Sequence, residues 1–144
     1  MARLPDFQLE TFFSRWEFNT KYNMCASNIE SVSLGELLLL SNVEDKKLWT
    51  KLDLGYTETY GSLNIREAIA DTYDNINSND ILTFAGGEEG IYVAMQCLLN
   101  KNDHAIVITP NYQSSETVPI SICGVTGIGL NPDDNWNLDI QEII

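Results

Sequence analysis

A pair of glycines separates an apolar segment from a helix-like segment in the stretch TFAGGEEG, residues 83–90. Gly86 and Gly87 are followed by two acidic residues, Glu88 and Glu89. At a turn from strand to helix, free backbone N–H groups and the positive end of the helix dipole favour an anion. Glycine permits the tight turn and a close approach of the ligand. The pattern therefore predicts either a phosphate cradle or a plain tight turn, with the glutamate side chains pointing outward.

Other chemistry has little support in the sequence. The nucleotide fingerprint G-x-G-x-x-G and the Walker lysine are absent. His104 is the only histidine and is expected in a loop, which leaves little for a catalytic triad or a histidine metal site. Cys25, Cys97 and Cys123 are odd in number and widely spaced, so buried, reduced thiols are expected.

The charge balance excludes two classes of partner. The 144 residues carry 21 acidic against 8 basic side chains, a formal net charge of -13. Such a surface repels nucleic acid and anionic membranes. The longest strongly apolar run, residues 37–40, is far shorter than the ~20 residues that span a bilayer, and no signal peptide is recognisable. A single folded, cytoplasmic protein is expected.

Helical periodicity dominates the first half of the chain. An aromatic-rich helix is predicted from a cap at Asp6 to about Tyr22. Ser33 and Glu36 have the spacing of a capping box at the start of a leucine-rich helix, whose four leucines predict burial on more than one side. Further expected elements are a helical or irregular piece (43–52), a loop (54–62) and an amphipathic helix capped by Ser62 (62–73).

The second half alternates between strand and helix patterns. A strand at 81–85, a helix at 88–99 and a strand at 105–109 predict a β-α-β unit. A helix at 113–122, a strand at 125–130 and the beginning of a helix at 138–144 continue the alternation. The order predicts an α/β fold with helices packed on a sheet.

Five segments in this order resemble one known family. They are Tyr56, YGSLNIREAIA (60–70), GGEEG (86–90), DHAIVITPNY (103–112) and WNLD (136–139). Together they resemble the N-terminal part of class I/II aminotransferases, the fold type I enzymes that use pyridoxal 5'-phosphate (PLP), and within them a branch that includes capreomycidine synthase-like proteins. The resemblance implies a three-layer α/β/α fold with an incomplete sheet, residues 1–53 forming an N-terminal helical segment and residues 54–144 part of the PLP-binding large domain.

The resemblance also assigns roles to residues. It implies that the backbone amides of Gly86, Gly87 and Glu88 cradle the cofactor phosphate, and that Tyr112 stacks on the pyridine ring. Tyr56 would reach across a homodimer interface to the partner's phosphate. The alternative for each tyrosine is a structural role, in which the ring packs in the core or at an interface. Arg66 corresponds to a structural helix residue, so it is left out of the site.

The chain departs from the family pattern in three respects. Relatives often have Ser or Thr where Glu88 and Glu89 stand, so the cradle loses one donor, and Lys101-Asn102-Asp103 replaces Pro-Gly-Asp as loop variation. The lysine that binds the cofactor, the aspartate at the pyridine nitrogen and the arginine for the substrate carboxylate are expected beyond Ile144. None of the five lysines has the right sequence context, so the chain alone is expected to be inactive.

The leading hypothesis is therefore an N-terminal fragment of a PLP-dependent aminotransferase, acting on amino acids and 2-oxo acids. Alternatives are a non-catalytic phosphate- or nucleotide-binding α/β module and an acidic interaction domain without a ligand. In the family, the strand before the cradle lies beside a strand from later in the chain. The strand at 81–85 is accordingly expected to pair with another copy, giving a strand-exchanged oligomer, or to rearrange.

Overall fold

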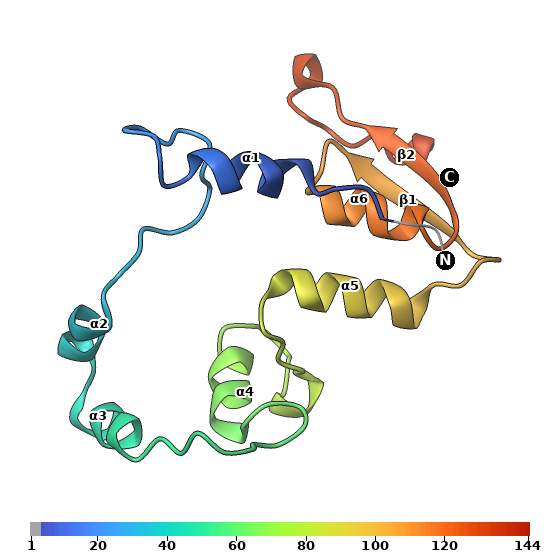
Figure 1. Ribbon diagram of the computed structural model, residues 1–144. Coiled ribbons are helices and arrows are strands. Elements are labelled where there is room, and N and C mark those ends of the chain that lie inside the picture. Colours follow the sequence, from blue (N-terminus) through green and yellow to red (C-terminus); the bar gives the residue numbers. More distant parts are fainter. Residues whose placement is uncertain (1–3) are drawn as a thin grey trace. The chain divides into compact units, whose positions relative to one another are not determined.

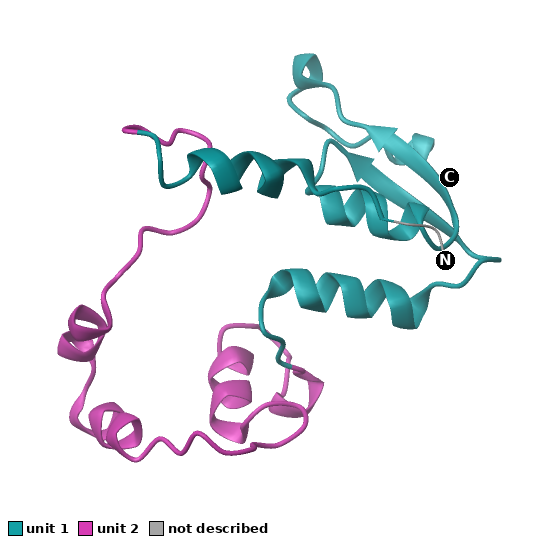
Figure 2. Cartoon of the chain, in the orientation of Figure 1, with its two compact units in different colours: residues 1–20, 83–144 teal, residues 21–82 magenta. Residues whose placement is uncertain are grey.

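The chain forms two compact units (Figure 2). The computed structural model describes residues 4–144. Unit 1 comprises residues 1–20 and 83–144, and unit 2 comprises residues 21–82. The division at residues 53 and 54 expected from the sequence stays a prediction.

The sheet of unit 1 consists of two parallel strands, β1 (His104–Thr109) and β2 (Gly124–Gly129), paired from their first residues to their last (Figure 1). β1 is rich in Val, Ile and Thr, which suit a pleated and half-buried surface, whereas three of the six residues of β2 are glycines. α6 (Gln113–Ile120) connects them, so the β-α-β unit of this structure is β1-α6-β2. These three elements confirm the sequence prediction within two residues at each end, and the α/β class with them.

The core of unit 1 lies where α6 meets the sheet and α5 (Gly87–Leu98). α6 packs against both strands and against α5. Val107 of β1, Val118 of α6 and Ile128 of β2 are buried, and each such side chain contributes about 1.5–3 kcal/mol on burial. Pro119 is fully buried in the last turn of α6, and the helix ends one residue later. Proline has no N–H to donate to the carbonyl four residues earlier, so it weakens the helical hydrogen bonding of this turn.

Residues 81–85 do not form the expected strand, and that prediction is wrong. Their backbone is irregular or extended, with Ile81 at φ -105° and ψ 129°. A strand requires a hydrogen-bonded neighbour as well as an apolar pattern. Within residues 4–144 the sheet contains β1 and β2 alone, so the segment is not part of that sheet.

His104 is also placed differently from the prediction. It is the first residue of β1 rather than a loop residue. Its Nε2 lies 2.8 Å from Oγ1 of Thr126 on the neighbouring strand. The strand begins one residue before the apolar run, because this cross-strand contact extends the pairing.

The first helix is shorter than expected. α1 (Gln8–Trp16) begins after Phe7, and no side chain caps it, so the prediction of an Asp6 cap is wrong. At its end, the side chains of Asn19 and Thr20 donate hydrogen bonds to the carbonyls of Arg15 and Trp16, at 2.8 and 3.1 Å. The Asn19 side chain thereby occupies the Arg15 carbonyl, and the Asn19 N–H donates to the Trp16 carbonyl at 3.1 Å instead of continuing the α-helical pattern.

Unit 2 contains short helices joined by loops. They are α2 (Leu34–Leu40), α3 (Val43–Thr50), α4 (Leu63–Ala70) and the 3-10 helix η1 (Ser78–Asp80). The predicted capping box is confirmed: Ser33 Oγ accepts from the Glu36 N–H at 3.2 Å, and Glu36 Oε2 accepts from the Ser33 N–H at 3.0 Å. The Ser33 hydroxyl and then its N–H hold the pKa of Glu36 below its ordinary value. Ser62 is the N-cap residue of α4, without a side-chain cap bond.

The leucines of α2 are not buried on several sides, contrary to the prediction. Leu37, Leu39 and Leu40 are 54%, 80% and 83% exposed. A leucine run favours a helix by propensity, whereas burial needs a second surface packed against it.

Arg66 ties α4 to the loops around it. Its Nε donates to the Gly61 carbonyl at 2.9 Å, and a guanidinium nitrogen donates to the Ser78 carbonyl at 2.6 Å. These contacts support the structural role assigned to it from the sequence.

Replacing Arg66 with methionine is expected to lower the free energy of unfolding by about 2 kcal/mol, because hydrogen bonds from a charged donor contribute roughly 1.5–3 kcal/mol. Methionine keeps the apolar stem and removes both donors. Urea denaturation followed by far-UV circular dichroism measures the change. Arg15→Met, at an exposed position of α1, is the matched control, and an equal loss in both variants would contradict the prediction.

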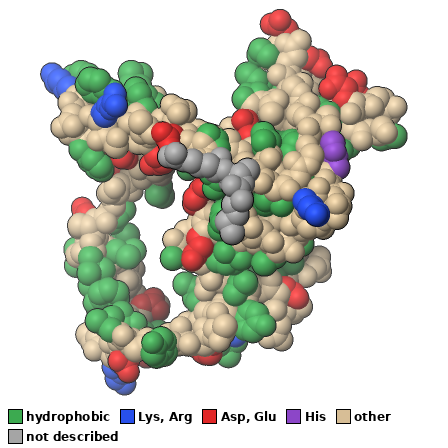
Figure 3. Space-filling model, turned by 45° about the vertical axis from the view of Figure 1, so that its right-hand side comes forward, with side chains coloured by type: hydrophobic (Ala, Val, Ile, Leu, Met, Phe, Trp, Pro, Cys, Tyr) green, Lys and Arg blue, Asp and Glu red, His purple; other side chains and the backbone are tan. Residues whose placement is uncertain are grey.

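The remaining elements are η2 (Pro132–Asp134) and η3 (Ile140–Glu142), the latter being the part of the expected C-terminal helix that is observed, as a 3-10 turn. In residues 4–144 no helix is long and apolar enough to cross a bilayer. On the face seen in Figure 3, acidic side chains lie in several places and basic side chains are few.

Candidate functional site

The turn before α5 has a backbone that favours glycine. Gly86 is the N-cap residue with φ 119° and ψ 157°, a region that essentially only glycine adopts. A Cβ placed on Gly86 or on Gly87 would meet no atom within 4 Å. The need for glycine at position 86 is therefore conformational, and the space above the turn is open.

This turn presents a set of unused backbone donors. The first helical hydrogen bond across the turn runs from the Gly90 N–H to the Gly86 carbonyl at 3.4 Å, and no side chain caps the helix. Within residues 4–144, the N–H groups of Gly86, Gly87 and Glu88 have no acceptor. A 12-residue helix adds its dipole to these donors. The donor set fits a phosphate group.

Gly90 allows an aromatic side chain to pack against the first turn of α5. A Cβ on Gly90 would lie 3.3 Å from Cδ2 of Phe84, so the absence of a side chain lets the Phe84 ring lie against the first turn of α5. This contact places the segment before the cradle directly against the helix that follows it.

The two glutamates of the turn accept hydrogen bonds, one from α6 and one from the segment before the turn, rather than pointing freely outward as expected. Glu88 Oε2 accepts from the Ser114 hydroxyl at 3.0 Å, and Glu89 Oε2 accepts from the Ala85 N–H at 2.7 Å. Neither carboxylate accepts from the N–H groups of the cradle. The acidic residues therefore leave the anion site accessible, and their charges are favoured by the helix dipole.

Tyr112 lies in the same unit as the cradle. It is the N-cap residue of α6 and is 43% exposed, and its ring centroid lies 5.1 Å from that of Phe7. Partial desolvation, and then the charges of Glu88 and Glu10, raise the pKa of the Tyr112 phenol. The ring is thus a neutral aromatic surface next to the start of a helix.

The segment before α1 is fastened to the residues around Tyr112. Gln113 Oε1 accepts from the Gln8 N–H at 2.8 Å, while Gln113 Nε2 donates to the Asp6 carbonyl at 2.9 Å. Phe7, Gln113 and Ser114 are not recognisable as site residues from the sequence. Their partners are 26 or more residues away, and no local pattern signals such a contact.

Tyr56 belongs to unit 2. It lies in the loop before α4, and its side chain is fully exposed. Its role in a second subunit stays a prediction.

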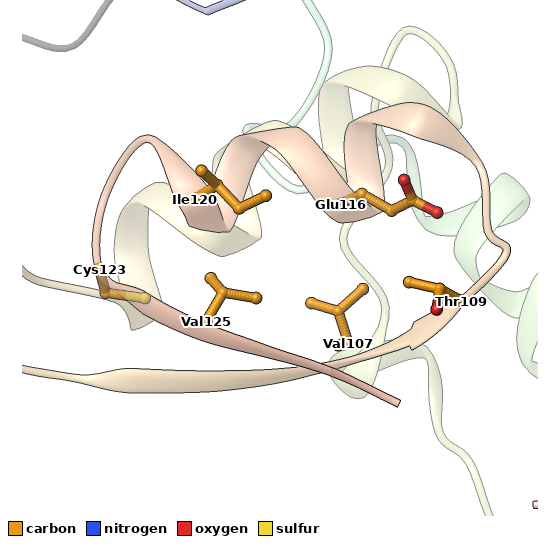
Figure 4. Close-up of a pocket in the computed structure, with 7 residues that line it drawn as sticks. Val107, Thr109, Glu116, Ile120, Cys123 and Val125 are labelled. Carbon is orange, nitrogen blue, oxygen red and sulfur yellow. The ribbon is translucent and has the colours of Figure 1, made fainter. Parts of the chain in front are cut away.

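A separate cavity of about 400 Å³ lies between α6 and the sheet (Figure 4). Glu116 carries the only charged side chain of its lining, and its Oε1 accepts from the Asn111 N–H at 2.8 Å. The other lining residues are Val107, Thr109, Ile120, Cys123, Val125 and Gly127. None of them belongs to the predicted site, so we assign the cavity to packing.

The three cysteines are free thiols. Cys123 is half-buried, whereas Cys25 and Cys97 are exposed, so the expected burial is wrong for two of the three. Among the residues that the structure describes, no group of three His, Cys, Asp or Glu side chains could hold a metal ion.

Comparison with known proteins gives consistent matches. A family model described as aminotransferase class I and II matches residues 42–144. Arginine–pyruvate transaminase AruH of Pseudomonas aeruginosa is 25% identical over 95 residues, which cover 61% of this chain and 24% of AruH. Transaminase BacF of Bacillus subtilis is 41% identical over 64 residues, which cover 40% of this chain and 16% of BacF.

Solved structures agree with these sequence matches. A PLP-dependent aminotransferase from Streptococcus suis superposes with a TM-score of 0.87 and 25% identity, over 99% of this chain and 39% of that chain. Substrate-bound BacF of Bacillus subtilis gives a TM-score of 0.56 and 30% identity, over 62% of this chain and 25% of that chain. The chain thus spans less than half the length of each of these relatives.

These matches do not favour a non-catalytic phosphate- or nucleotide-binding module, and the capreomycidine synthase-like branch stays a prediction. The family model covers more than half of the chain, and the relatives matched are aminotransferases. The chain therefore belongs to the aminotransferase class I and II family of PLP-dependent enzymes and has the α/β fold of an N-terminal part of such an enzyme.

Proposed function

We propose that the protein carrying this chain transfers an amino group between an amino acid and a 2-oxo acid, with PLP as its cofactor. The observation that carries the proposal is the uncapped start of α5, where three backbone N–H groups have no acceptor within residues 4–144. PLP, when bound, supplies a conjugated ring that stabilises negative charge on the substrate carbon next to the amino group.

The cradle would hold the cofactor phosphate through main-chain atoms. The N–H groups of Gly86, Gly87 and Glu88 would donate to it, and the helix dipole would favour its charge. Because the donors belong to the backbone, the identity of the side chains at this turn matters less than its conformation. The φ of 119° at Gly86 is the feature that fixes this conformation.

Tyr112 would stack on the pyridine ring of the cofactor. A flat, neutral phenol suits a conjugated ring, and offset or tilted aromatic pairs are favourable. The direction of the shift in the Tyr112 pKa favours the neutral phenol over the phenolate.

The complete enzyme is proposed to be a homodimer in which Tyr56 of one subunit reaches the cofactor phosphate of the other. The Tyr56 side chain is fully exposed, so its ring is available for contact with a second subunit. An oligomer that pairs residues 81–85 between copies is the alternative, because these residues have the apolar pattern of a strand.

We also propose a division of the chain, a set of catalytic residues outside it, and a cellular compartment. Residues 1–53 form an N-terminal helical segment, and residues 54–144 form part of the PLP-binding domain. Catalysis requires a cofactor-binding lysine, an aspartate and an arginine that we expect outside these 144 residues, so the chain alone would be inactive. The three free thiols suit a reducing compartment such as the cytoplasm.

Binding of PLP to the purified protein tests the proposal. We expect thermal stabilisation by PLP and none by ATP or NAD. Tyr112→Ala should weaken PLP binding about tenfold, because aromatic pairing contributes roughly 0.5–1.5 kcal/mol beyond area burial. Tyr112→Phe keeps the ring and should bind nearly as well as the wild type. Tyr22→Ala, at an exposed position in unit 2, is the control. Thermal stabilisation by ATP or NAD, with no stabilisation by PLP, would contradict the proposal.

A further inference from the structure

Ser114 is a buried polar residue at the start of α6. It is the second residue of the helix, two positions after Tyr112, and it is 2% exposed. Its hydroxyl donates to Glu88 Oε2 at 3.0 Å, across 26 residues of sequence. A buried hydroxyl needs a partner, and an ionised carboxylate is a strong one.

The bond joins the starts of two helices. Glu88 is the second residue of α5, and the first turn of this helix carries the backbone N–H groups of the cradle. Ser114 is the second residue of α6 and lies two positions after Tyr112. Ser114 and Val118 are four residues apart and share one face of α6. Since Ser114 contacts Glu88, this buried face is turned toward α5.

Glu88 is related to both parts of the site, through its backbone and through its carboxylate. Its side chain is directed to Ser114 and does not accept from the cradle, and its charge contributes to the raised pKa of Tyr112. Glu88 is thus near the cradle through its backbone and near the aromatic ring through its side chain.

We propose that Glu88 and Ser114 are positioning residues whose hydrogen bond sets the spacing between the backbone amides of the cradle and the ring of Tyr112. The site would then select a ligand whose phosphate and aromatic ring are joined by a short linker of fixed length. This inference rests on the proposed function, because it takes PLP as that ligand.

Binding of two ligands distinguishes a positioning role of Ser114 from a general loss of structure. Inorganic phosphate uses the cradle alone, whereas PLP uses the cradle and the ring of Tyr112 together. Ser114→Ala should weaken PLP binding about tenfold, the effect of losing a hydrogen bond to a charged group, and leave phosphate binding within about twofold. Ser114→Thr keeps the hydroxyl and should restore PLP binding. Ser115→Ala, one position along the same helix, is the matched control.

Glu88→Ala gives an independent test at an exposed position, where misfolding is not expected. It removes a negative charge beside the cradle, so phosphate binding should become tighter while PLP binding weakens. The double variant Glu88→Ala/Ser114→Ala should bind PLP no more weakly than Ser114→Ala alone, because both substitutions break one bond. Binding is measured by isothermal titration calorimetry, and the induced circular dichroism of bound PLP above 300 nm reports the orientation of its ring.

The outcomes distinguish this inference from the proposed function. If the wild type binds PLP and Ser114→Ala binds it equally well with an unchanged dichroism band, the positioning role is overturned and the proposed function stands. Parallel losses of phosphate and PLP binding in Ser114→Ala, not restored by threonine, overturn it as well. A wild type that binds neither ligand overturns both proposals.

Discussion

Replacing Gly86 with valine is expected to weaken PLP binding by between about tenfold and 100-fold, the largest loss expected from a single substitution in the cradle. Gly86 has φ 119° and ψ 157°, and holding another residue in such a region costs of order 1–3 kcal/mol. A β-branched side chain is among the least tolerant of it. The turn would relax to an ordinary φ, and the N–H groups that follow would no longer converge on one point.

Gly87→Ala is the matched variant. Gly87 adjoins Gly86 and has no positive φ, and a Cβ there meets no atom within 4 Å. We expect a loss of PLP affinity of less than about threefold, since no backbone strain is introduced. Isothermal titration calorimetry with PLP and with inorganic phosphate measures both variants. Equal losses in the two variants would show that space above the turn, rather than the conformation of Gly86, governs binding.

The elements that the sequence predicts well are those that carry their own signals. β1, α6 and β2 follow from short apolar runs and a helical segment bounded by turn residues, and the capping box at Ser33 follows from local spacing. The strand at 81–85 fails for a different reason. Its pattern is that of a strand, but within residues 4–144 it is not part of the sheet formed by β1 and β2. Pattern predicts extended backbone, and pairing decides whether a strand forms.

The candidate site divides in the same way. The turn at Gly86 is visible in the sequence because its conformation needs glycine, and Tyr112 is visible through the resemblance to aminotransferases. The contacts that fix their arrangement, Ser114 with Glu88 and Phe7 with Tyr112, join residues far apart in the chain. Serine and phenylalanine have many roles, so only the fold reveals which role these two have.

The second large effect is expected in the core, from Val118→Asp. Val118 is 3% exposed on the face of α6 that is turned toward α5. A carboxylate there would be buried without a partner, and such substitutions lower the free energy of unfolding by more than about 3 kcal/mol. That is a large fraction of the ~5–15 kcal/mol that holds a domain together. Unit 1 should lose its cooperative unfolding transition, seen in urea denaturation followed by circular dichroism.

A graded series makes this expectation specific. Val118→Ala removes two methyl groups and should lower the free energy of unfolding by about 1–2.5 kcal/mol, with the fold retained. Phe18→Asp places the same charge at a 90% exposed position of unit 1 and should change stability by less than about 0.5 kcal/mol. Because Ser114 shares the face of Val118, Val118→Ala should also loosen the start of α6 and weaken PLP binding slightly. If Val118→Asp unfolded with the midpoint of Phe18→Asp, α6 would not pack on α5 through this face, and the spacing between cradle and ring would need another support.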